Sequence, residues 1–325
     1  MSRPWSFALA SRTFLALAAL GLAFGALGAV GCMAEADTKN NDNTADGGHI
    51  WPDGMTNNNN QNTNENTNTN GNWQPPLNSR VYINTRDTLY YIDPGESQDM
   101  VEVGDFQGAC TQGSGFYDIA VDADKNMLGI AAEGLYSVNS ETAACSLVFE
   151  FPEGSPHFFS LSYVKGVDPE NPDVDALIAA SVEEGEWVLI DYPGEHIQNI
   201  FVHLGYYDPS NKEWLSSGDI VSVQTGFDQY VTYATLKCPN YEDPGCESDW
   251  LARINPVTGS AELIGQTGFQ QIFGLGFWGD QVYGFTNAGE YIVIDVETGQ
   301  GTLVEELPDR SYWGAGNTTK AHTVL

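Results

Sequence analysis

Five copies of one short sequence pattern constrain the fold of this chain more than any other feature. Each copy contains an apolar or aromatic residue, further strand-forming residues, a branched aliphatic residue, and then Asp or Asn where a turn begins. The copies occupy Leu89–Asp93, Leu135–Asn139, Trp187–Asp191, Trp250–Asn255 and Tyr291–Asp295. The steps between their last residues are 46, 52, 64 and 40 residues. A strand and turn that recur in this way indicate a repeated supersecondary unit.

The length of the step favours one repeat architecture. Repeats of this length, with runs of Val, Ile, Tyr, Phe and Trp between turn residues, are typical of the four-stranded blades of a β-propeller and not of helical solenoids. The 35 Gly and 15 Pro provide the turns that many short strands need. We therefore expect an all-β domain over residues 78–325, in which the pattern forms the third strand of each blade. A β-sandwich is the alternative.

Four complete blades can be assigned along the sequence. Their predicted strands are 116–122, 127–132, 135–138 and 146–151, then 158–164, 176–182, 187–190 and 199–204, then 219–224, 229–236, 250–254 and 261–265, and finally 272–278, 281–285, 290–294 and 302–306. Residues 80–84, 89–92 and 100–104 supply only three strands of a fifth blade. Residues 312–317 are similar to the first strand at 272–277 and supply the missing one. The sequence thus predicts a five-bladed β-propeller closed by a C-terminal strand, which leaves no open sheet edge.

The N-terminal residues have the composition of an export signal. Arg3 and Arg12 precede an apolar run that carries no charge from Thr13 to Cys32, so we predict a signal peptide over residues 1–31. A membrane-anchoring helix is the alternative. Residues 32–77 are rich in Asn and Thr and have almost no apolar side chains, so they cannot offset the entropy lost on ordering. This segment is predicted to be a disordered spacer.

The sequence before Cys32 resembles the lipobox of bacterial lipoproteins. Ala29-Val30-Gly31-Cys32 carries the resemblance, although Ala29 stands where these proteins usually have Leu. The resemblance implies that Cys32 is lipidated and tethers the mature protein to a membrane. Met33 follows in place of Asp, which by resemblance to enterobacterial sorting implies the outer membrane. Cleavage after Ala34 and free secretion is the alternative.

The other four cysteines fit two disulfides. Cys110 with Cys145 and Cys238 with Cys246 are the plausible pairs, and the second pair encloses a short segment rich in turn residues. Both would form in an oxidising compartment outside the cytoplasm. Free thiols are the alternative, while the spacing required for a zinc site is missing.

Small residues recur where the first strands would face the propeller axis, and they suggest a narrow channel. Asp118, Ser160 and Asp219 are the polar members, so they are the candidate ligand-binding residues, with water or a cation as ligand. Catalysis by the two carboxyls, one as acid and one as base, is an alternative. No known catalytic motif occurs. We expect no cofactor, with Ca²⁺ as an alternative, since Asp122-Ala-Asp-Lys-Asn126 resembles a calcium loop but fits a hairpin turn better.

The charge of the chain excludes some partners. The sequence has 44 acidic and 12 basic residues, so it lacks the basic patches that bind nucleic acid or anionic membranes. We expect membrane contact only through the lipid anchor. Aromatic residues near predicted loops are candidates for stacking on sugars or on a protein partner: Tyr206, Tyr207, Trp214, Tyr241 and Trp278.

The turns at Ile254–Gly259 and Ile294–Gly299 resemble those of bacterial YVTN-like and WD40-like propeller proteins. Together with the lipobox, the resemblance implies a monomeric, surface-tethered propeller of the bacterial cell envelope. Its expected role is non-catalytic binding or scaffolding, with an envelope protein or a glycan as ligand. A lectin-like sugar binder and a secreted glycan-active enzyme, similar to five-bladed glycoside hydrolases, are the alternatives.

Overall fold

The computed structural model describes residues 79–191, 200–211, 213–226, 229–321 and 323. The predicted signal peptide, the lipidated Cys32 and the Asn-rich spacer lie outside the described residues and stay predictions. Within these ranges, no helix is both long and apolar enough to cross a membrane.

The described residues form five antiparallel sheets, each with four main strands counted outward from a common axis. The inner strands are β21 (Gly314–Gly316), β5 (Asp118–Val121), β9 (Ser160–Val164), β13 (Leu215–Gly226) and β17 (Ile272–Trp278). The second strands are β1 (Val81–Asn84), β6 (Met127–Ala131), β10 (Ala176–Ala180), β14 (Gln229–Lys237) and β18 (Gln281–Thr286). The third strands are β2 (Thr88–Asp93), β7 (Gly134–Val138), β11 (Glu186–Ile190), β15 (Trp250–Ile254) and β19 (Glu290–Asp295). The outer strands are β3 (Ser97–Asp105), β8 (Ala144–Glu150), β12 (Phe201–Tyr206), β16 (Ala261–Gln266) and β20 (Gly301–Glu306).

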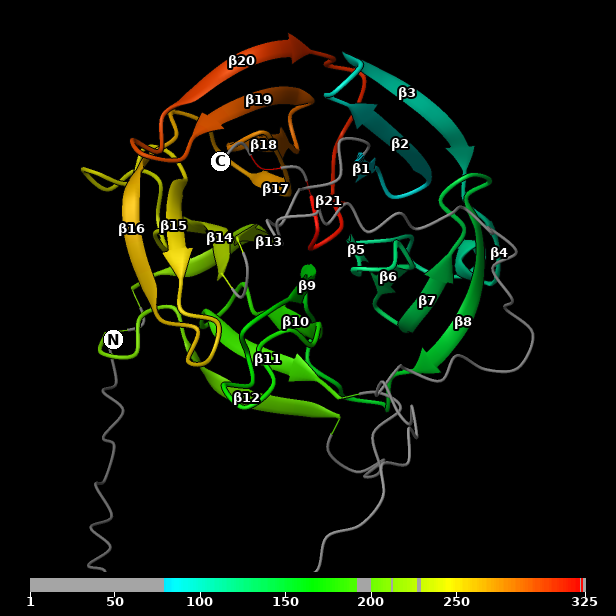
Figure 1. Cartoon of the computed structure of the whole chain (residues 1–325), viewed down its shortest axis with the longest axis horizontal. Helices are drawn as coiled ribbons and strands as arrows, with labels where there is room; N and C mark the ends of the chain where they lie inside the picture. The colour runs from blue at the N-terminus through cyan, green and yellow to red at the C-terminus, as the bar shows by residue number, and fades with distance from the viewer. Residues whose placement is uncertain (1–78, 192–199, 212, 227–228, 322, 324–325) are drawn as a thin grey trace, which may run out of the picture. The chain divides into compact units, whose positions relative to one another are not determined.

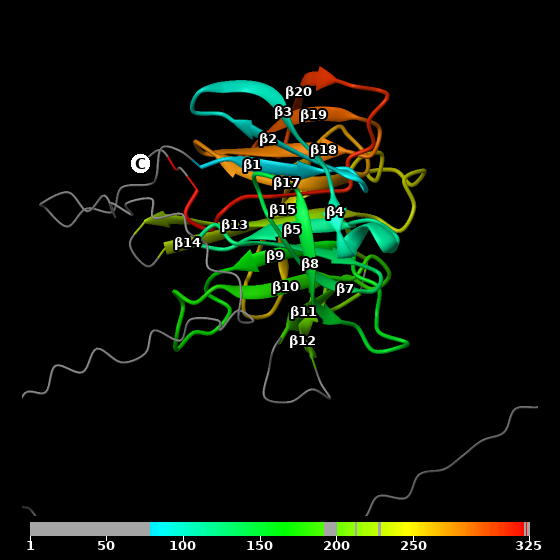
Figure 2. The same cartoon turned by 90° about the vertical axis from the view of Figure 1, so that its right-hand side faces the viewer.

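These sheets are the blades of a closed ring. Each inner strand contacts the next, in the order β21, β5, β9, β13, β17 and back to β21. Figure 1 looks along the axis of the ring and Figure 2 shows it from the side. We number the blades 1 to 5 in the order of these inner strands. The five-bladed propeller predicted from the sequence is confirmed.

Blade 1 is completed by both ends of the domain. Inner strand β21 pairs antiparallel with β1, with Tyr82 opposite Gly316 and Asn84 opposite Gly314. The backbone N–H of Trp313 extends the pairing by donating to the carbonyl of Asn84 at 2.9 Å. The predicted C-terminal strand thus closes the ring, and Figure 1 shows it at the centre beside β1.

The Asp or Asn that ends the repeated pattern accepts hydrogen bonds in the turn that follows the third strand. Asn139, Asn255 and Asp295 each accept hydrogen bonds at Oδ1 from the N–H groups two and three residues further on. An Asp or Asn in this place stabilises the turn into the outer strand because its side chain substitutes for a backbone acceptor.

The hydrophobic core is divided among the junctions between blades. One cluster joins Trp187 and Ile178 of blade 3 to Ile220 and Ala234 of blade 4, and similar clusters join blades 1 and 2, 4 and 5, and 5 and 1. At these four junctions the blades are held together by apolar side chains contributed from both sides.

Two features were not predicted from the sequence. A short strand, β4 (Gln107–Gly108), lies parallel to the outer strand β8 and leads into a 3-10 turn, η1 (Ala109–Gln112). The segment after β21 crosses the end of the ring away from Trp313, where Thr318 forms a bridge with Val121 and the Gln224 N–H donates to the Thr319 carbonyl at 2.8 Å. This C-terminal segment covers that end of the axis.

Candidate functional site

Five equivalent backbone N–H groups point at the centre of the ring, one from each inner strand. They belong to Ile119, Leu161, Ile220, Leu275 and Ala315. Asp118 accepts two of them, from Ile119 at 2.7 Å and from Leu161 at 2.7 Å. Asp219 accepts the other three, from Ile220 at 2.5 Å, Leu275 at 2.7 Å and Ala315 at 3.3 Å. Two carboxyl groups therefore satisfy the whole ring of donors.

Both carboxyl groups are removed from water. Asp118 and Asp219 have an exposed fraction of 0 %, and their side chains hydrogen-bond to each other. Burial raises the pKa of both carboxyls well above the usual range, and the charge of Asp219 raises the pKa of Asp118 further. Two carboxylates in contact in a buried site cannot both ionise easily. The pair therefore takes up a proton at a higher pH than two exposed carboxyl groups would.

Glycine occupies this position in the other two inner strands that meet the carboxyls. A Cβ on Gly314 would collide with Oδ1 and Cα of Asp118, and a Cβ on Gly274 would lie 2.8 Å from the Gly314 carbonyl carbon. The small residues along the axis thus make room for two carboxyl groups. Ser160, the fifth residue, turns its hydroxyl to the backbone of Ala180 in its own blade.

The structure brings the predicted residues Asp118 and Asp219 together, with Ser160 in the same ring of positions. All three have an exposed fraction of 0 %, so the open channel expected from the sequence does not reach them. Whether they bind any ligand stays a prediction. Their visible role is to accept hydrogen bonds from backbone groups.

A solvent-accessible site lies at the start of the inner strands. The residue immediately before the small axial residue is aromatic in four of the five blades: Tyr117, Phe159, Phe273 and Trp313. Their ring centroids lie 4.7 Å apart for Tyr117 and Phe159, 6.0 Å for Tyr117 and Trp313, and 5.8 Å for Phe273 and Trp313. All four are half-buried. We call this arc of rings the aromatic collar.

The collar has one gap, at Gly218 of β13. A Cβ on this residue would collide with the carbonyl oxygen of Ile272 and the Cα of Phe273, so the close approach of β13 to β17 leaves room only for glycine. A pocket of about 210 Å³ opens in the gap. Its lining comprises Phe159, Val182, Ser217, Gly218, Lys237, Phe273 and Trp313.

Two basic side chains stand at the collar. The guanidinium of Arg86 lies over the ring of Trp313, 3.9 Å from its centroid. Lys237, the last residue of β14, lines the pocket itself. The nearby carboxylate of Asp249 is buried behind Ser217 and accepts hydrogen bonds from the Ser217 hydroxyl at 2.5 Å and the Ile272 N–H at 2.8 Å.

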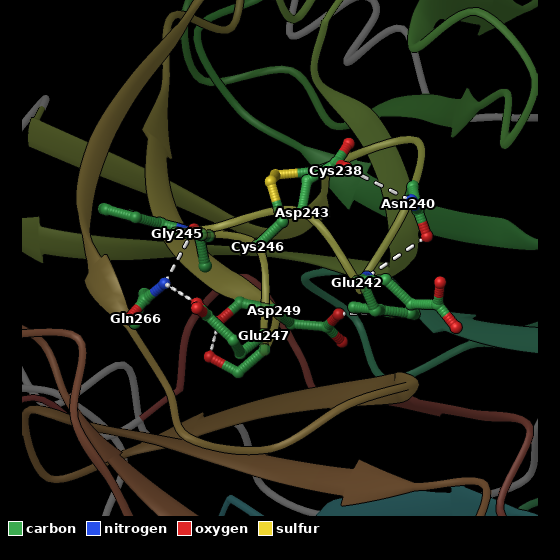
Figure 3. Close-up of a disulfide and its surroundings, with 12 residues drawn as sticks. Cys238, Asn240, Glu242, Asp243, Gly245, Cys246, Glu247, Asp249 and Gln266 are labelled. Atoms are coloured by element: carbon green, nitrogen blue, oxygen red, sulfur yellow. Dashed lines mark hydrogen bonds between the residues drawn. A yellow bond between two sulfur atoms is a disulfide. The ribbon is translucent and has the colours of Figure 1, made fainter.

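The loop closed by the disulfide between Cys238 and Cys246 lies beside this pocket, because it begins at the residue after Lys237. Cys238 and Cys246 are joined, as are Cys110 and Cys145 at the outer edge of blade 2. Figure 3 shows the short loop closed by the first of these disulfides, with Asp249 next to it. Within the loop, the Tyr241 hydroxyl donates to Oδ1 of Asp249 at 2.6 Å. Both disulfides predicted from the sequence are present, and they indicate an oxidising compartment.

The aromatic residues that the sequence analysis proposed for stacking on sugars or on a protein partner do not belong to the collar. Tyr207 is buried, Tyr241 is held by Asp249, Trp214 packs against Trp250, Tyr206 packs against His203, and Trp278 is half-buried beside the core cluster of blades 1 and 5. Sequence reasoning missed the collar, although a signal was present. Phe273 and Trp313 occupy the same position in the two segments whose similarity predicted the closing strand.

The described residues contain no group of three or more His, Cys, Asp or Glu placed to hold a metal ion. In the turn that resembles a calcium loop, Asp122 accepts hydrogen bonds from Asp124 and Asn126 of the same turn. That turn joins β5 to β6, as the hairpin interpretation predicts.

Comparison with known proteins gives no family. No model of a protein family matches the chain, and no curated protein is similar to it in sequence. Among solved structures, a protein of unknown function from Bacteroides caccae is 9% identical, with a TM-score of 0.35 over 71% of this chain and 73% of that one. A selenomethionine-substituted virginiamycin B lyase from Staphylococcus aureus is 8% identical, with a TM-score of 0.36 over 71% of each chain. At such TM-scores neither similarity carries an argument about this chain.

Proposed function

We propose that this protein is a non-catalytic binding propeller whose ligand is a glycan held in the pocket at the gap of the aromatic collar. The observation that carries the proposal is the collar itself, in which the same position of four blades presents a half-exposed ring around one end of the axis. These four side chains keep part of their surface accessible, and three of them, Phe159, Phe273 and Trp313, line the pocket.

The chemistry of the collar suits a sugar. A pyranose ring has a face of C–H groups that packs on the negative face of an aromatic ring, and its hydroxyl groups stay in water at the rim. A concave pocket with apolar walls and few polar groups is the usual form of a small-molecule site. Val182, Phe159 and Phe273 provide such walls here.

The propeller is further proposed to be exported and tethered to the bacterial envelope through Cys32. The two disulfides support a compartment outside the cytoplasm. The tether can be tested by replacing Cys32 with Ala and fractionating the cells. Wild-type protein should be recovered with membranes and Cys32→Ala in the soluble fraction, whereas equal distribution of both would contradict a lipid anchor.

Glycan binding can be tested with the purified domain on a glycan array. Trp313→Ala removes one wall of the pocket and should abolish binding to the sugars that the wild type retains. Tyr91→Ala is the matched control, because Tyr91 is also a half-buried ring that carries an arginine, with Arg80 4.0 Å from its centroid, but it lies on β2 away from the collar. Failure of the wild type to bind any glycan would overturn the proposal. Equal loss in both variants would mean destabilisation of blade 1 and would also count against the site.

A further inference from the structure

We propose that the sugar bound in the collar pocket is acidic, a hexuronic acid residue whose carboxylate is recognised by Lys237. This inference rests on the proposed glycan-binding function and specifies its ligand class. It follows from the charges around the pocket, from the partners of those charges, and from the size of the space.

Lys237 brings a positive charge into an otherwise apolar wall. The seven residues that line the pocket include no carboxylate, and within the described part of the chain Lys237 forms no ion pair. A half-buried ammonium beside aromatic rings is incompletely compensated, so an anionic group entering the pocket would gain a charge-assisted hydrogen bond. A carboxylate on the ligand supplies that group.

Asp249, the buried carboxylate beside Ser217, is not available to pair with Lys237. Asp249 is buried and accepts from Ser217, Tyr241 and Ile272, so both of its oxygens are engaged. Lys237 influences this carboxylate only through space, as one of the weaker effects that lower its pKa against the dominant effect of burial. The hydroxyl of Ser217 donates to Asp249, so Lys237 is the charged donor that the pocket lining offers to a ligand.

Arg86 adds a second positive charge at the rim. Its guanidinium covers the face of Trp313 at 3.9 Å and lies 5.5 Å from the ring of Tyr117. Of the 12 basic residues of the chain, Lys237 lines the pocket and Arg86 covers Trp313, one of the pocket's walls. The arrangement makes the collar locally favourable for an anion although the net charge of the chain is -32.

The volume limits how much of the ligand enters. Pockets for drug-sized molecules occupy about 300–1,000 Å³, and this pocket of about 210 Å³ is smaller. It can take one sugar ring, so the remainder of a polysaccharide would leave the pocket toward solvent. A terminal or protruding uronic acid residue fits both the space and the charge.

The test uses pairs of sugars that differ only at the carboxylate. The methyl glycosides of glucuronic, galacturonic and mannuronic acid are titrated against the wild-type protein by ligand-observed NMR, each beside its neutral hexoside. We expect at least one uronide to bind tenfold or more tightly than its neutral partner. Lys237→Gln should remove that preference, while Lys237→Arg should retain it. Lys125→Gln, an equal change of charge at an exposed turn at the other end of the ring, is the matched control and should behave as wild type.

The outcomes separate this inference from the function on which it rests. Equal binding of a uronide and its neutral partner, or a preference that survives Lys237→Gln, overturns the role of Lys237 while glycan binding stands. If the protein bound tetramethylammonium and none of the sugars, the collar would be an aromatic cage for cations. That result would overturn both the glycan-binding function and the role of Lys237. Absence of binding to all the sugars in the wild type would contradict the proposed function itself.

Discussion

At the scale of single residues, the centre of the ring depends on the hydrogen-bonding capacity of a carboxyl group. An ionised carboxylate only accepts and has room for several donors, whereas Asn or Ser would bring donors of their own. Five backbone N–H groups converge where only two side chains fit, so two acceptor-rich side chains are required. The residue types at 118 and 219 therefore follow from the geometry of the backbone.

Replacing Asp219 with Asn should destabilise the domain strongly. The amide keeps one acceptor oxygen, but its NH₂ group faces backbone N–H groups that the carboxylate accepted. A buried donor without a partner costs about 1–3 kcal/mol, so we expect a loss of about 2–5 kcal/mol in the free energy of unfolding. Urea unfolding measures it. Asp124→Asn, at an exposed turn residue, should change stability by less than about 0.5 kcal/mol, and equal effects of the two substitutions would contradict the role assigned to Asp219.

The proton held by the carboxyl pair predicts a pH dependence. The pKa values of Asp118 and Asp219 are raised in the folded state, so the folded protein binds more protons than the unfolded chain above about pH 4. Stability from this pair is therefore complete below about pH 4 and declines as the pH rises, by up to about 1.4 kcal/mol per pH unit for one proton.

Asp118→Asn removes one of the two titrating carboxyl groups and the mutual effect of the pair, and so tests its contribution to the pH dependence. The variant should be less stable than wild type at pH 4, because one acceptor is lost, and the difference should shrink as the pH rises to 8. Urea unfolding of both proteins across this range gives the comparison, in which the other carboxyl groups cancel. A difference that stays constant with pH would show that the pair holds no extra proton.

At the scale of elements, strand β21 has more influence than its three residues suggest. It completes blade 1 by pairing with β1, it contacts β5 and β17 on either side, and Ala315 donates to Asp219. The residues after it cover the far end of the axis, where Thr319 also donates to Asp175 at 3.0 Å. One short segment thus joins blades 1, 2, 3, 4 and 5.

Deleting residues 311–325 should abolish cooperative unfolding of the domain. The deletion exposes the edge of β1, removes Trp313 from the collar and leaves Phe277 N–H without Asn317, its acceptor at 2.7 Å. Circular dichroism during thermal unfolding should show no sharp transition, and adding a peptide of residues 311–325 should restore one. A truncated protein that unfolds cooperatively without the peptide would mean that the ring is stable when open.

At the scale of the whole molecule, the excess of acidic residues predicts a response to salt. Residues 78–325 contain 38 acidic and 9 basic residues, and this net charge of -29 creates repulsion within the folded domain, which screening reduces. Raising NaCl from 10 to 150 mM should increase the Tm, with a smaller gain above that concentration, because the Debye length falls from about 30 to about 8 Å. A sucrose series of equal osmolality provides the control. A Tm independent of salt would show that the acidic groups lie too far apart to interact.

Much of this architecture could be predicted from the sequence, because the spacing between copies of the repeated pattern gives the length of one blade. The five copies ending at Asp93, Asn139, Asp191, Asn255 and Asp295 located the third strands, and the strands around them followed. The burial of Asp118 and Asp219 could not be predicted, since it depends on how closely the inner strands approach. The aromatic collar was missed because each ring stands alone in the sequence, and only the circular arrangement brings four of them together.

The pairing of β1 with β21 also determines when blade 1 can be completed during synthesis of the chain. The 229 residues between Asn84 and Gly314 must all be synthesised before blade 1, the first sheet to begin, can be completed. At about 5–20 residues per second, synthesis of that stretch takes roughly 10 to 50 seconds. Throughout this interval the edge of β1 has no native neighbour, so the earliest part of the domain to emerge is the last to mature. A cell that makes this protein has to shield that edge from other nascent chains until the final strand arrives.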